Sequence, residues 1–294
     1  MSFLKYFING LSLGSVYAII ALGYTMVYGI AKMLNFAHGD VIMIGGFVVF
    51  TCMANLGINA ILALLIAMIF CTILGVVVER IAYRPLRNAS SSLAVLITAI
   101  GVSYFLQNIA LLIFGADAKT FTPVVSAPPI ELFGGELTVT VVALVTIAVN
   151  IVIMIGLTLF IKKTKAGQAM QAVSEDRGAA ALMGINVNGT IALTFAIGSA
   201  LAAVAGALMC SAYPQLTPYT GTMPGIKAFV AAVFGGIGSI PGAMIGGLLI
   251  GIIEILGKAY ISSQMADAIV FVILIVILLV KPAGILGKNV QEKV

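Results

Sequence analysis

The sequence predicts an all-α membrane protein, a polytopic helical bundle of about eight spans with interrupted helices. Of its 294 residues, 62% are hydrophobic and 9% are charged, whereas a soluble domain carries about 25% charged residues. A globule with so few charges could not cover its surface in water, but lipid solvates apolar side chains. The apolar runs are as long as a spanning helix, about 20 residues, and they lack the two-residue alternation of barrel strands.

Eight apolar stretches are candidate spans, and Gly is frequent in them, as in helices that pack closely in lipid. They are residues 8–30, 38–54, 58–79, 93–114, 138–161, 190–212, 226–257 (interrupted) and 264–280. No stretch between them is polar enough for a soluble module, so residues 1–294 are predicted to form a single transmembrane domain. The first run follows no small-residue cleavage site, which favours an uncleaved anchor.

Basic residues set the expected orientation, because cytoplasmic loops collect Lys and Arg. Ten of the fifteen basic residues lie in three regions, which are therefore expected in the cytoplasm: 80–87, 162–177 and 281–293. The acidic 115–137 loop and the uncharged 213–225 loop are expected outside. Counting back from the first basic region places the 31–39 loop inside and Met1 outside, whereas a re-entrant 38–54 segment would place Met1 inside.

The stretch Asn35–Asp40 interrupts two apolar runs and contains His38, the single His of the chain. Charged groups at membrane depth cost about 2.5–3.5 kcal/mol each on insertion scales, and they persist where they line a cavity or lie at an interface. One interpretation is a polar interfacial turn in which Asp40 caps the following helix. The other is a broken helix that lines a solute path, with Asn35, His38 and Asp40 as candidates.

A second irregular stretch, Phe234–Gly242, has five Gly or Pro among nine residues, and each would weaken a continuous helix by about 1–3 kcal/mol. We expect non-helical backbone, which at membrane depth must face protein or water; a cytoplasmic hairpin loop is the alternative. The sequence Met-Ile-Gly-Gly follows both stretches, at residues 43–46 and 244–247. Paired interrupted helices are typical of transporter sites. The path candidates in this stretch are Gly235, Gly236, Gly238, Ser239 and Pro241.

The longest predicted cytoplasmic segment, residues 162–190, is Ala-rich and broken near Ser174–Asp176. We expect two short helices, the second beginning near Ser174 with acids in its first turn. Residues 179–183 would give the second helix a small apolar face, which suits docking of another protein; a plain amphipathic surface helix is the alternative. The docking candidates are Ser174, Glu175, Asp176, Ala179, Leu182 and Gly184.

Lys227 and Glu254 lie in or beside apolar segments, where they either pair across the interrupted region or reach an interface separately. The three Cys residues lie within apolar runs, as packing residues do. There is no phosphate-binding Gly-Lys-Ser/Thr loop, no His/Cys metal spacing and no nucleophile with a His partner. We therefore expect no catalytic and no metal site. No nucleic-acid partner is expected either, because no basic face with interleaved aromatics occurs.

Several segments, in order along nearly the whole chain, resemble the permease subunit of bacterial branched-chain amino-acid ABC importers (LivH type). They are Gly23–Gly29 with Asn35–Asp40, Glu79–Arg87, Ser174–Asp176 leading to Leu182–Asn186, Lys227–Phe229 with Gly235–Gly242, and Lys281–Gly287. The resemblance implies an ABC importer permease type of fold and a multi-pass place in the cell inner membrane. It also implies that this chain is a transporter subunit, not an enzyme, and binds no cofactor itself.

The resemblance further implies partners. These are a second homologous permease subunit that shares the translocation path, two cytoplasmic ATP-binding subunits that use ATP-Mg, and a periplasmic or extracellular binding protein that delivers leucine, isoleucine or valine. Residues 162–190 would form the coupling loop, although Gly184 lies nine positions after Glu175 and the Glu-Ala-Ala…Gly pattern of other importers is followed only loosely. Urea, short amides or other amino acids are alternative solutes. A stand-alone channel or ion-coupled carrier is the alternative of a different class.

Overall fold

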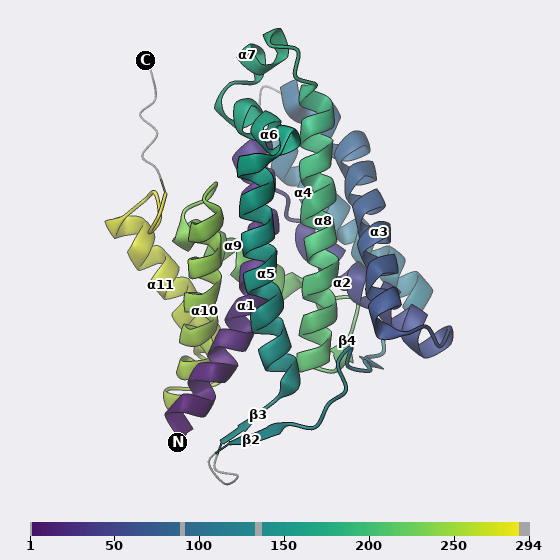
Figure 1. Cartoon of the computed structure of the whole chain (residues 1–294), viewed down its shortest axis with the longest axis vertical. Coiled ribbons are helices and arrows are strands. Elements are labelled where there is room, and N and C mark those ends of the chain that lie inside the picture. Colours follow the sequence, from purple (N-terminus) through teal and green to yellow (C-terminus); the bar gives the residue numbers. More distant parts are fainter. Residues whose placement is uncertain (1, 89–91, 133–136, 288–294) are drawn as a thin grey trace.

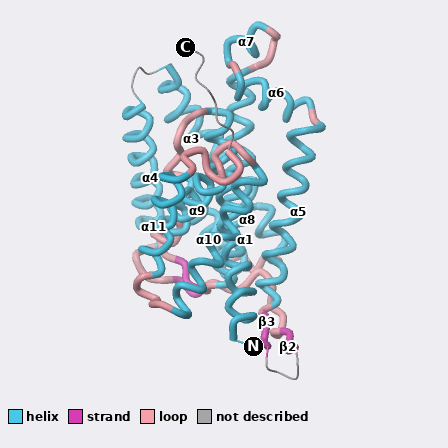
Figure 2. Tube along the Cα trace, turned by 90° about the vertical axis from the view of Figure 1, so that its left-hand side faces the viewer, coloured by secondary structure: helices cyan, strands magenta, loops and turns pink. Residues whose placement is uncertain are grey.

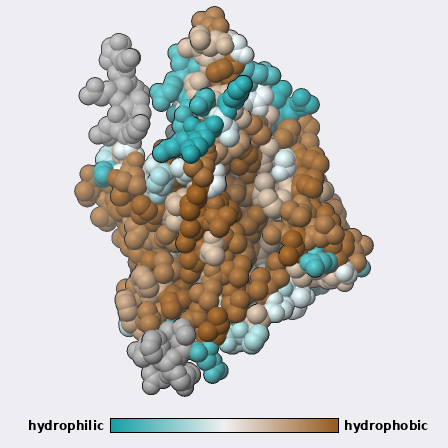
Figure 3. Space-filling view, viewed as in Figure 1, coloured by the Kyte–Doolittle hydropathy of each residue, from teal (hydrophilic) through white to brown (hydrophobic). Residues whose placement is uncertain are grey.

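The computed structural model describes residues 2–88, 92–132 and 137–287, and these form a tall bundle of helices. Most helices run along the long axis of the bundle (Figure 1). In Figure 3 an apolar belt covers the middle of one face, and hydrophilic side chains gather toward its upper end. Within the described ranges, 7 helices are long and apolar enough to cross a membrane. The prediction of a polytopic all-α membrane protein is therefore confirmed.

The secondary structure is almost entirely helical. The helices are Ser2–Ala31 (α1), His38–Phe50 (α2), Thr51–Asn55 (η1), Ala60–Val78 (α3), Glu79–Tyr83 (η2), Arg84–Asn88 (η3), Ser92–Phe114 (α4), Val141–Lys163 (α5), Lys165–Glu175 (α6), Arg177–Leu182 (α7), Val187–Ala212 (α8), Thr222–Gly235 (α9), Ile240–Tyr260 (α10) and Ala266–Val280 (α11). The strands pair antiparallel, Lys119–Thr120 (β1) with Gln215–Leu216 (β4) and Ile130–Leu132 (β2) with Leu137–Val139 (β3).

The predicted span 226–257 is two helices rather than one interrupted helix. Gly235 packs on Gly242 and Gly246 packs on Ala231, so α9 and α10 run antiparallel. With 14 residues, α9 is about 21 Å long, which is shorter than the hydrocarbon core of a bilayer, about 30 Å. Helices α9, α10 and α11 make three full or partial crossings. An odd number is required because the 213–225 loop is expected outside and residues 281–293 are expected in the cytoplasm.

The two ends of the bundle carry the loops that were assigned to opposite sides of the membrane. Helices α6 and α7 lie at one end and the β2–β3 hairpin at the other, in both Figure 1 and Figure 2. Helix α1 begins at the hairpin end, and its last residue, Ala31, accepts a hydrogen bond from Arg177 at the opposite end. The 31–39 loop and the 162–190 segment therefore lie at the same end, as the distribution of basic residues predicted.

Helices α1 and α8 form the buried centre of the bundle, and α10 packs along α1. Glycine lines the close contacts of α1 with α10 and of α2 with α8. A Cβ atom on Gly14 would lie 2.7 Å from the Cα of Leu248, and one on Gly45 would lie 2.7 Å from the Cα of Ala203. Small residues at helix contacts are typical of membrane proteins, where close van der Waals packing drives helix association.

Candidate functional site

The first predicted interruption, Asn35–Asp40, lies three residues later than the observed non-helical segment, residues 32–37, which turns back into the bundle. Lys32 adopts a left-handed conformation with φ of 52°, and α2 then begins at His38, whose ring lies against Gly23 of α1. Gly23 lies eight residues before the end of α1 at Ala31, so α2 begins about 12 Å inside that end. The N-cap of α2 is Ala37, without a side-chain hydrogen bond. The expected cap by Asp40 is therefore wrong, and the broken-helix interpretation describes the backbone.

The second predicted interruption is a tight turn between α9 and α10. Gly236 and Gly238 have φ of 106° and 93°, a region that glycine adopts without steric cost. Ser239 accepts a hydrogen bond from the N–H of Gly242 at 3.2 Å and so caps α10. Gly238 lies beside Gly29, close to the end of α1, so the hairpin-loop alternative is correct. These residues shape the turn, as do the buried Gly235 and the exposed Pro241.

A narrow pocket nevertheless brings the two stretches together. It is lined by Tyr24 and Tyr28 of α1, Leu34 and Asn35 of the non-helical segment, Phe229 and Ala232 of α9, and Ile237 of the turn. Asn35 is held at the pocket wall because the hydroxyl of Tyr83 donates a hydrogen bond to its Oδ1 at 2.8 Å. Of the predicted path residues, Asn35 lines this pocket directly.

Aromatic rings pack around the pocket. The ring centroids of Tyr24 and His38 are 4.8 Å apart, and those of Tyr24 and Phe229 are 5.8 Å apart. Phe36 adds a third contact, 5.6 Å from Phe229. Edge-to-face contacts at these separations stabilise the arrangement by about 0.5–1.5 kcal/mol each. His38 thus belongs to the aromatic cluster behind the pocket wall.

Asp40 lies in a separate polar cluster that joins the beginnings of two helices to the middle of a third. Its side chain accepts a hydrogen bond from the Nε2 of Gln107 in α4 at 2.8 Å. The same nitrogen lies 3.5 Å from the hydroxyl of Thr222, the first residue of α9. Asp40 and Gln107 are 2% and 6% exposed. The cluster therefore places a buried carboxylate where α2, α4 and α9 meet.

Lys227 and Glu254 form an ion pair, as one interpretation of the sequence predicted. The Nζ of Lys227 lies 2.8 Å from Glu254 and 2.6 Å from Asp267. Glu254 also contacts Lys258 at 2.6 Å and accepts a hydrogen bond from the Tyr17 hydroxyl at 2.8 Å. The network therefore joins α1, α9, α10 and α11.

The 162–190 segment contains the two short helices that were predicted, with a boundary two to three residues later than expected. Ser174 remains in α6, and Asp176 caps α7 by accepting a hydrogen bond from the Ala179 N–H at 2.9 Å. Gly184, with φ of 81°, ends α7. Leu182 is 90% exposed, and Glu175 and Ala179 are exposed as well. Helix α7 thus presents an apolar tip, which is the brown cap at the top of Figure 3.

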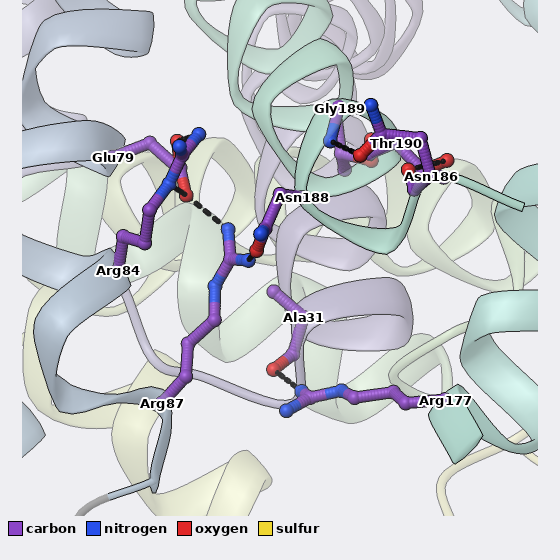
Figure 4. Close-up of polar contacts among 10 residues, drawn as sticks. Ala31, Glu79, Arg84, Arg87, Arg177, Asn186, Asn188, Gly189 and Thr190 are labelled. Carbon is purple, nitrogen blue, oxygen red and sulfur yellow. Dashed lines mark hydrogen bonds and ion pairs between the residues drawn. The ribbon is translucent and has the colours of Figure 1, made fainter. Parts of the chain in front are cut away.

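Figure 4 shows how this end of the bundle is tied together. The side chain of Glu79 is fully buried and accepts hydrogen bonds from Arg84, at 2.9 Å, and from Arg87. Arg87 also donates to the Oδ1 of Asn188 at 2.5 Å. These contacts fix the end of α3 to the beginning of α8.

Arg177 makes the contact that connects the 162–190 segment to α1. Its guanidinium donates a hydrogen bond to the backbone carbonyl of Ala31 (Figure 4). Ala31 is the residue directly before the non-helical 32–37 segment. The exposed α7 therefore touches the chain at the point where α1 breaks. The sequence did not predict this contact, because a backbone acceptor carries no residue signal.

Comparison with known proteins matches the chain over nearly its whole length. Residues 6–278 match the family described as branched-chain amino acid transport system, permease component. The LivH permease protein of the high-affinity branched-chain amino acid transport system of Salmonella typhimurium (strain LT2) is 48% identical, covering 99% of this chain and 98% of that protein. LivH of Escherichia coli (strain K12) is 47% identical and BraD of Pseudomonas aeruginosa 44% identical, with the same coverage. Among solved structures, PsaBC from Streptococcus pneumoniae in complex with Fab is 15% identical, with a TM-score of 0.48 over 96% of this chain and 93% of that chain.

Proposed function

Because this chain belongs to the family of branched-chain amino acid transport system permease components, we propose that it forms the membrane path of an ATP-driven importer for leucine, isoleucine and valine. It is a transporter subunit and not an enzyme, and it is a multi-pass protein of the cell inner membrane. In the proposed assembly a second homologous permease completes the path, and an external binding protein delivers the amino acid. Two cytoplasmic ATP-binding subunits hydrolyse ATP-Mg.

The observation that carries the proposal is the exposed apolar tip of α7. Leu182 and Met183 are 90% and 82% exposed at the end of the bundle that is assigned to the cytoplasm. Large apolar side chains gathered in water mark contact sites for other proteins. Gly184 ends the helix directly behind them, and a Cβ there would meet nothing within 4 Å. We therefore assign this tip to the groove of an ATP-binding subunit.

The force from that subunit would enter the membrane helices through Arg177. When the ATP-binding subunits close, α7 moves, and Arg177 moves the end of α1 by its hydrogen bond to Ala31. A ligand-driven change of this kind requires that the partner bind one conformation more tightly than the other. The buried Glu79 cluster keeps α3 and α8 fixed at the same end, so that the displacement concentrates at residues 32–37.

The pocket has the chemistry that a branched-chain amino acid needs in passing. The walls formed by Leu34, Phe229 and Ile237 suit an aliphatic side chain. Tight binding is unnecessary here if the external protein selects the solute, because a transported molecule must also leave. Urea or short amides would not use the apolar wall, which favours an amino acid with an apolar side chain.

The test measures solute-stimulated ATP hydrolysis by the reconstituted importer and compares two Leu→Arg variants of this chain. Leu182→Arg puts a charge on the α7 tip, and Leu56→Arg puts one on a residue that is 65% exposed before α3. We expect Leu182→Arg to abolish solute-stimulated ATP hydrolysis and co-purification of the ATP-binding subunits, while Leu56→Arg retains both.

Three results would contradict the proposal. Equal activity of both variants would show that α7 is not the docking site. Amino-acid uptake by this chain alone in vesicles would identify a channel or an ion-coupled carrier. If the external protein binds urea or an amide and does not bind leucine, the proposed solute is wrong.

A further inference from the structure

Asp40 is an acidic residue of the membrane helices that lacks a basic partner. The other acids on the described membrane helices are paired: Glu79 with Arg84 and Arg87, Glu254 with Lys227 and Lys258, and Asp267 with Lys227. Within residues 2–88, 92–132 and 137–287, no Lys or Arg forms an ion pair with Asp40. Because Asp40 is only 2% exposed, water does not supply the missing counter-charge in the isolated chain.

The contacts that Asp40 does make are neutral. The amide of Gln107 donates a hydrogen bond at 2.8 Å, and the Ser103 hydroxyl and the backbone N–H of Asp40 itself donate to the same carboxylate. An ionised carboxylate offers about four acceptor positions, so one position remains for a further donor. Asp40 lies in the first turn of α2, where the helix dipole favours a negative charge but contributes only a partial positive one. These neutral donors do not neutralise the charge of the carboxylate, so it remains able to take a cation.

A polar surface lies next to this carboxylate. Gln107 connects Asp40 to Thr222, which is exposed at the start of α9. Further along the surface of α4, Tyr104 is 63% exposed, and the exposed Asn108 donates only to the Tyr104 carbonyl of its own helix, at 2.7 Å. Exposed polar groups at membrane depth are costly in lipid and are found where they face protein or a water-filled path. This side of α4 and α9 therefore faces protein or a water-filled path rather than lipid.

From these observations we infer that Asp40 binds the α-ammonium group of the amino acid in transit. The inference rests on the proposed function and adds the residue that recognises the charged amino end. An ammonium group supplies the positive charge and the three N–H donors that the carboxylate lacks. Gln107 keeps its own hydrogen bond to Asp40, which limits the strength of the contact and lets the solute move on. The site would thus accept α-amino acids and reject neutral amides of similar size.

The experiment measures leucine uptake by the complete importer in proteoliposomes, with saturating loaded binding protein, together with ATP hydrolysis and the yield of assembled complex. Asp40→Asn removes the charge and keeps the shape. We expect uptake to fall at least tenfold, the order expected when one partner of a buried charge pair is lost, while the yield of assembled complex, which does not depend on the ammonium contact, stays close to that of wild type.

A second pair of variants supplies the cation from within the chain. Ser103 lies one helical turn before Gln107 on α4, 3.3 Å from its Nε2. Ser103→Lys puts an ammonium beside Asp40 and should block uptake, whereas Ser103→Met, of similar length without charge, should lower it by less than half.

The outcomes separate this inference from the proposed function. Uptake by Asp40→Asn within twofold of wild type would overturn the inference, and so would equal losses in Ser103→Lys and Ser103→Met. If Asp40→Asn does not assemble, the Ser103 pair decides alone. A wild-type importer that assembles and hydrolyses ATP but carries no amino acid would overturn the proposed function, and this inference with it.

Discussion

Lys227→Met is expected to destabilise the protein by about 3 kcal/mol, because it leaves a buried carboxylate with too little positive charge. The side chains of Lys227 and Glu254 are 6% and 2% exposed and lie 2.8 Å apart. Removing one partner of a buried ion pair costs about 3–5 kcal/mol. The lower end applies because Lys258 stays at 2.6 Å from Glu254 and Tyr17 still donates to it.

The assay is thermal unfolding of the purified protein in detergent. A loss of about 3 kcal/mol corresponds to a fall of roughly 6–12 °C in Tm for a protein of this size. Lys258→Met is the matched control: the Lys258 side chain is 40% exposed, so water screens its charge, and its removal should cost about 1 kcal/mol or less.

The double variant Lys227→Met/Glu254→Met tests the cause of that loss. Replacing a whole buried pair with apolar side chains is often neutral, so the double variant should recover most of the lost Tm. A double variant less stable than Lys227→Met would refute the reasoning, because the loss would then come from packing and not from an unpaired charge. A Lys258→Met variant as unstable as Lys227→Met would refute it as well, because burial would not matter.

Three further predictions use the same unfolding assay, and the last adds amide exchange. Gly45→Ala should destabilise the protein by about 1–3 kcal/mol through overpacking, because the new Cβ would lie 2.7 Å from the Cα of Ala203. The control Gly101→Ala should be neutral or slightly stabilising, because nothing lies within 4 Å of its new Cβ. Equal effects of the two substitutions would contradict the packing argument. Glu79→Gln should cost about 3 kcal/mol, since Glu79 is fully buried between two Arg side chains, and an unchanged Tm would show that its charge is not needed. Gly184→Ala should cost about 1 kcal/mol because its φ is 81°, and it should speed amide exchange in α7 alone.

The membrane spans could be predicted because bilayer thickness sets the length of an apolar run. The capped start of α7 was partly predictable, since Asp176 is a residue type that accepts hydrogen bonds at an N-cap. Its boundary was missed by two to three residues, because Ser174 and Asp176 are both good caps and the sequence did not choose between them. In the structure Asp176 is the cap, and Ser174 donates instead to the Gln171 carbonyl within α6.

The turn at residues 236–239 could not be distinguished from a break at membrane depth. Gly and Pro weaken a helix locally in either case, and only packing decides whether the chain continues or reverses. The reversal depends on contact between Gly235 and Gly242 and on the 284–287 segment, which packs on Gly236. Gln107, by contrast, carried a signal that was overlooked: a polar residue with Ser103 one turn before it, inside an apolar run.

The contact between the beginnings of α2 and α9 links the end of the bundle that carries α6 and α7 to the Asp40 cluster. Gly39 of α2 packs on Gly221 and Gly225 at the start of α9, backbone against backbone, so any displacement of α2 must also move α9 or part the two. Only seven residues lie between Ala31, which accepts the hydrogen bond from Arg177, and Gly39, and the 32–37 segment among them is not helical. A pull on the end of α1 therefore reaches the α2–α9 contact through a short stretch of chain. Asp40 is the next residue, so the step driven by ATP would move the carboxylate directly, without passing through the packed core of α1, α8 and α10.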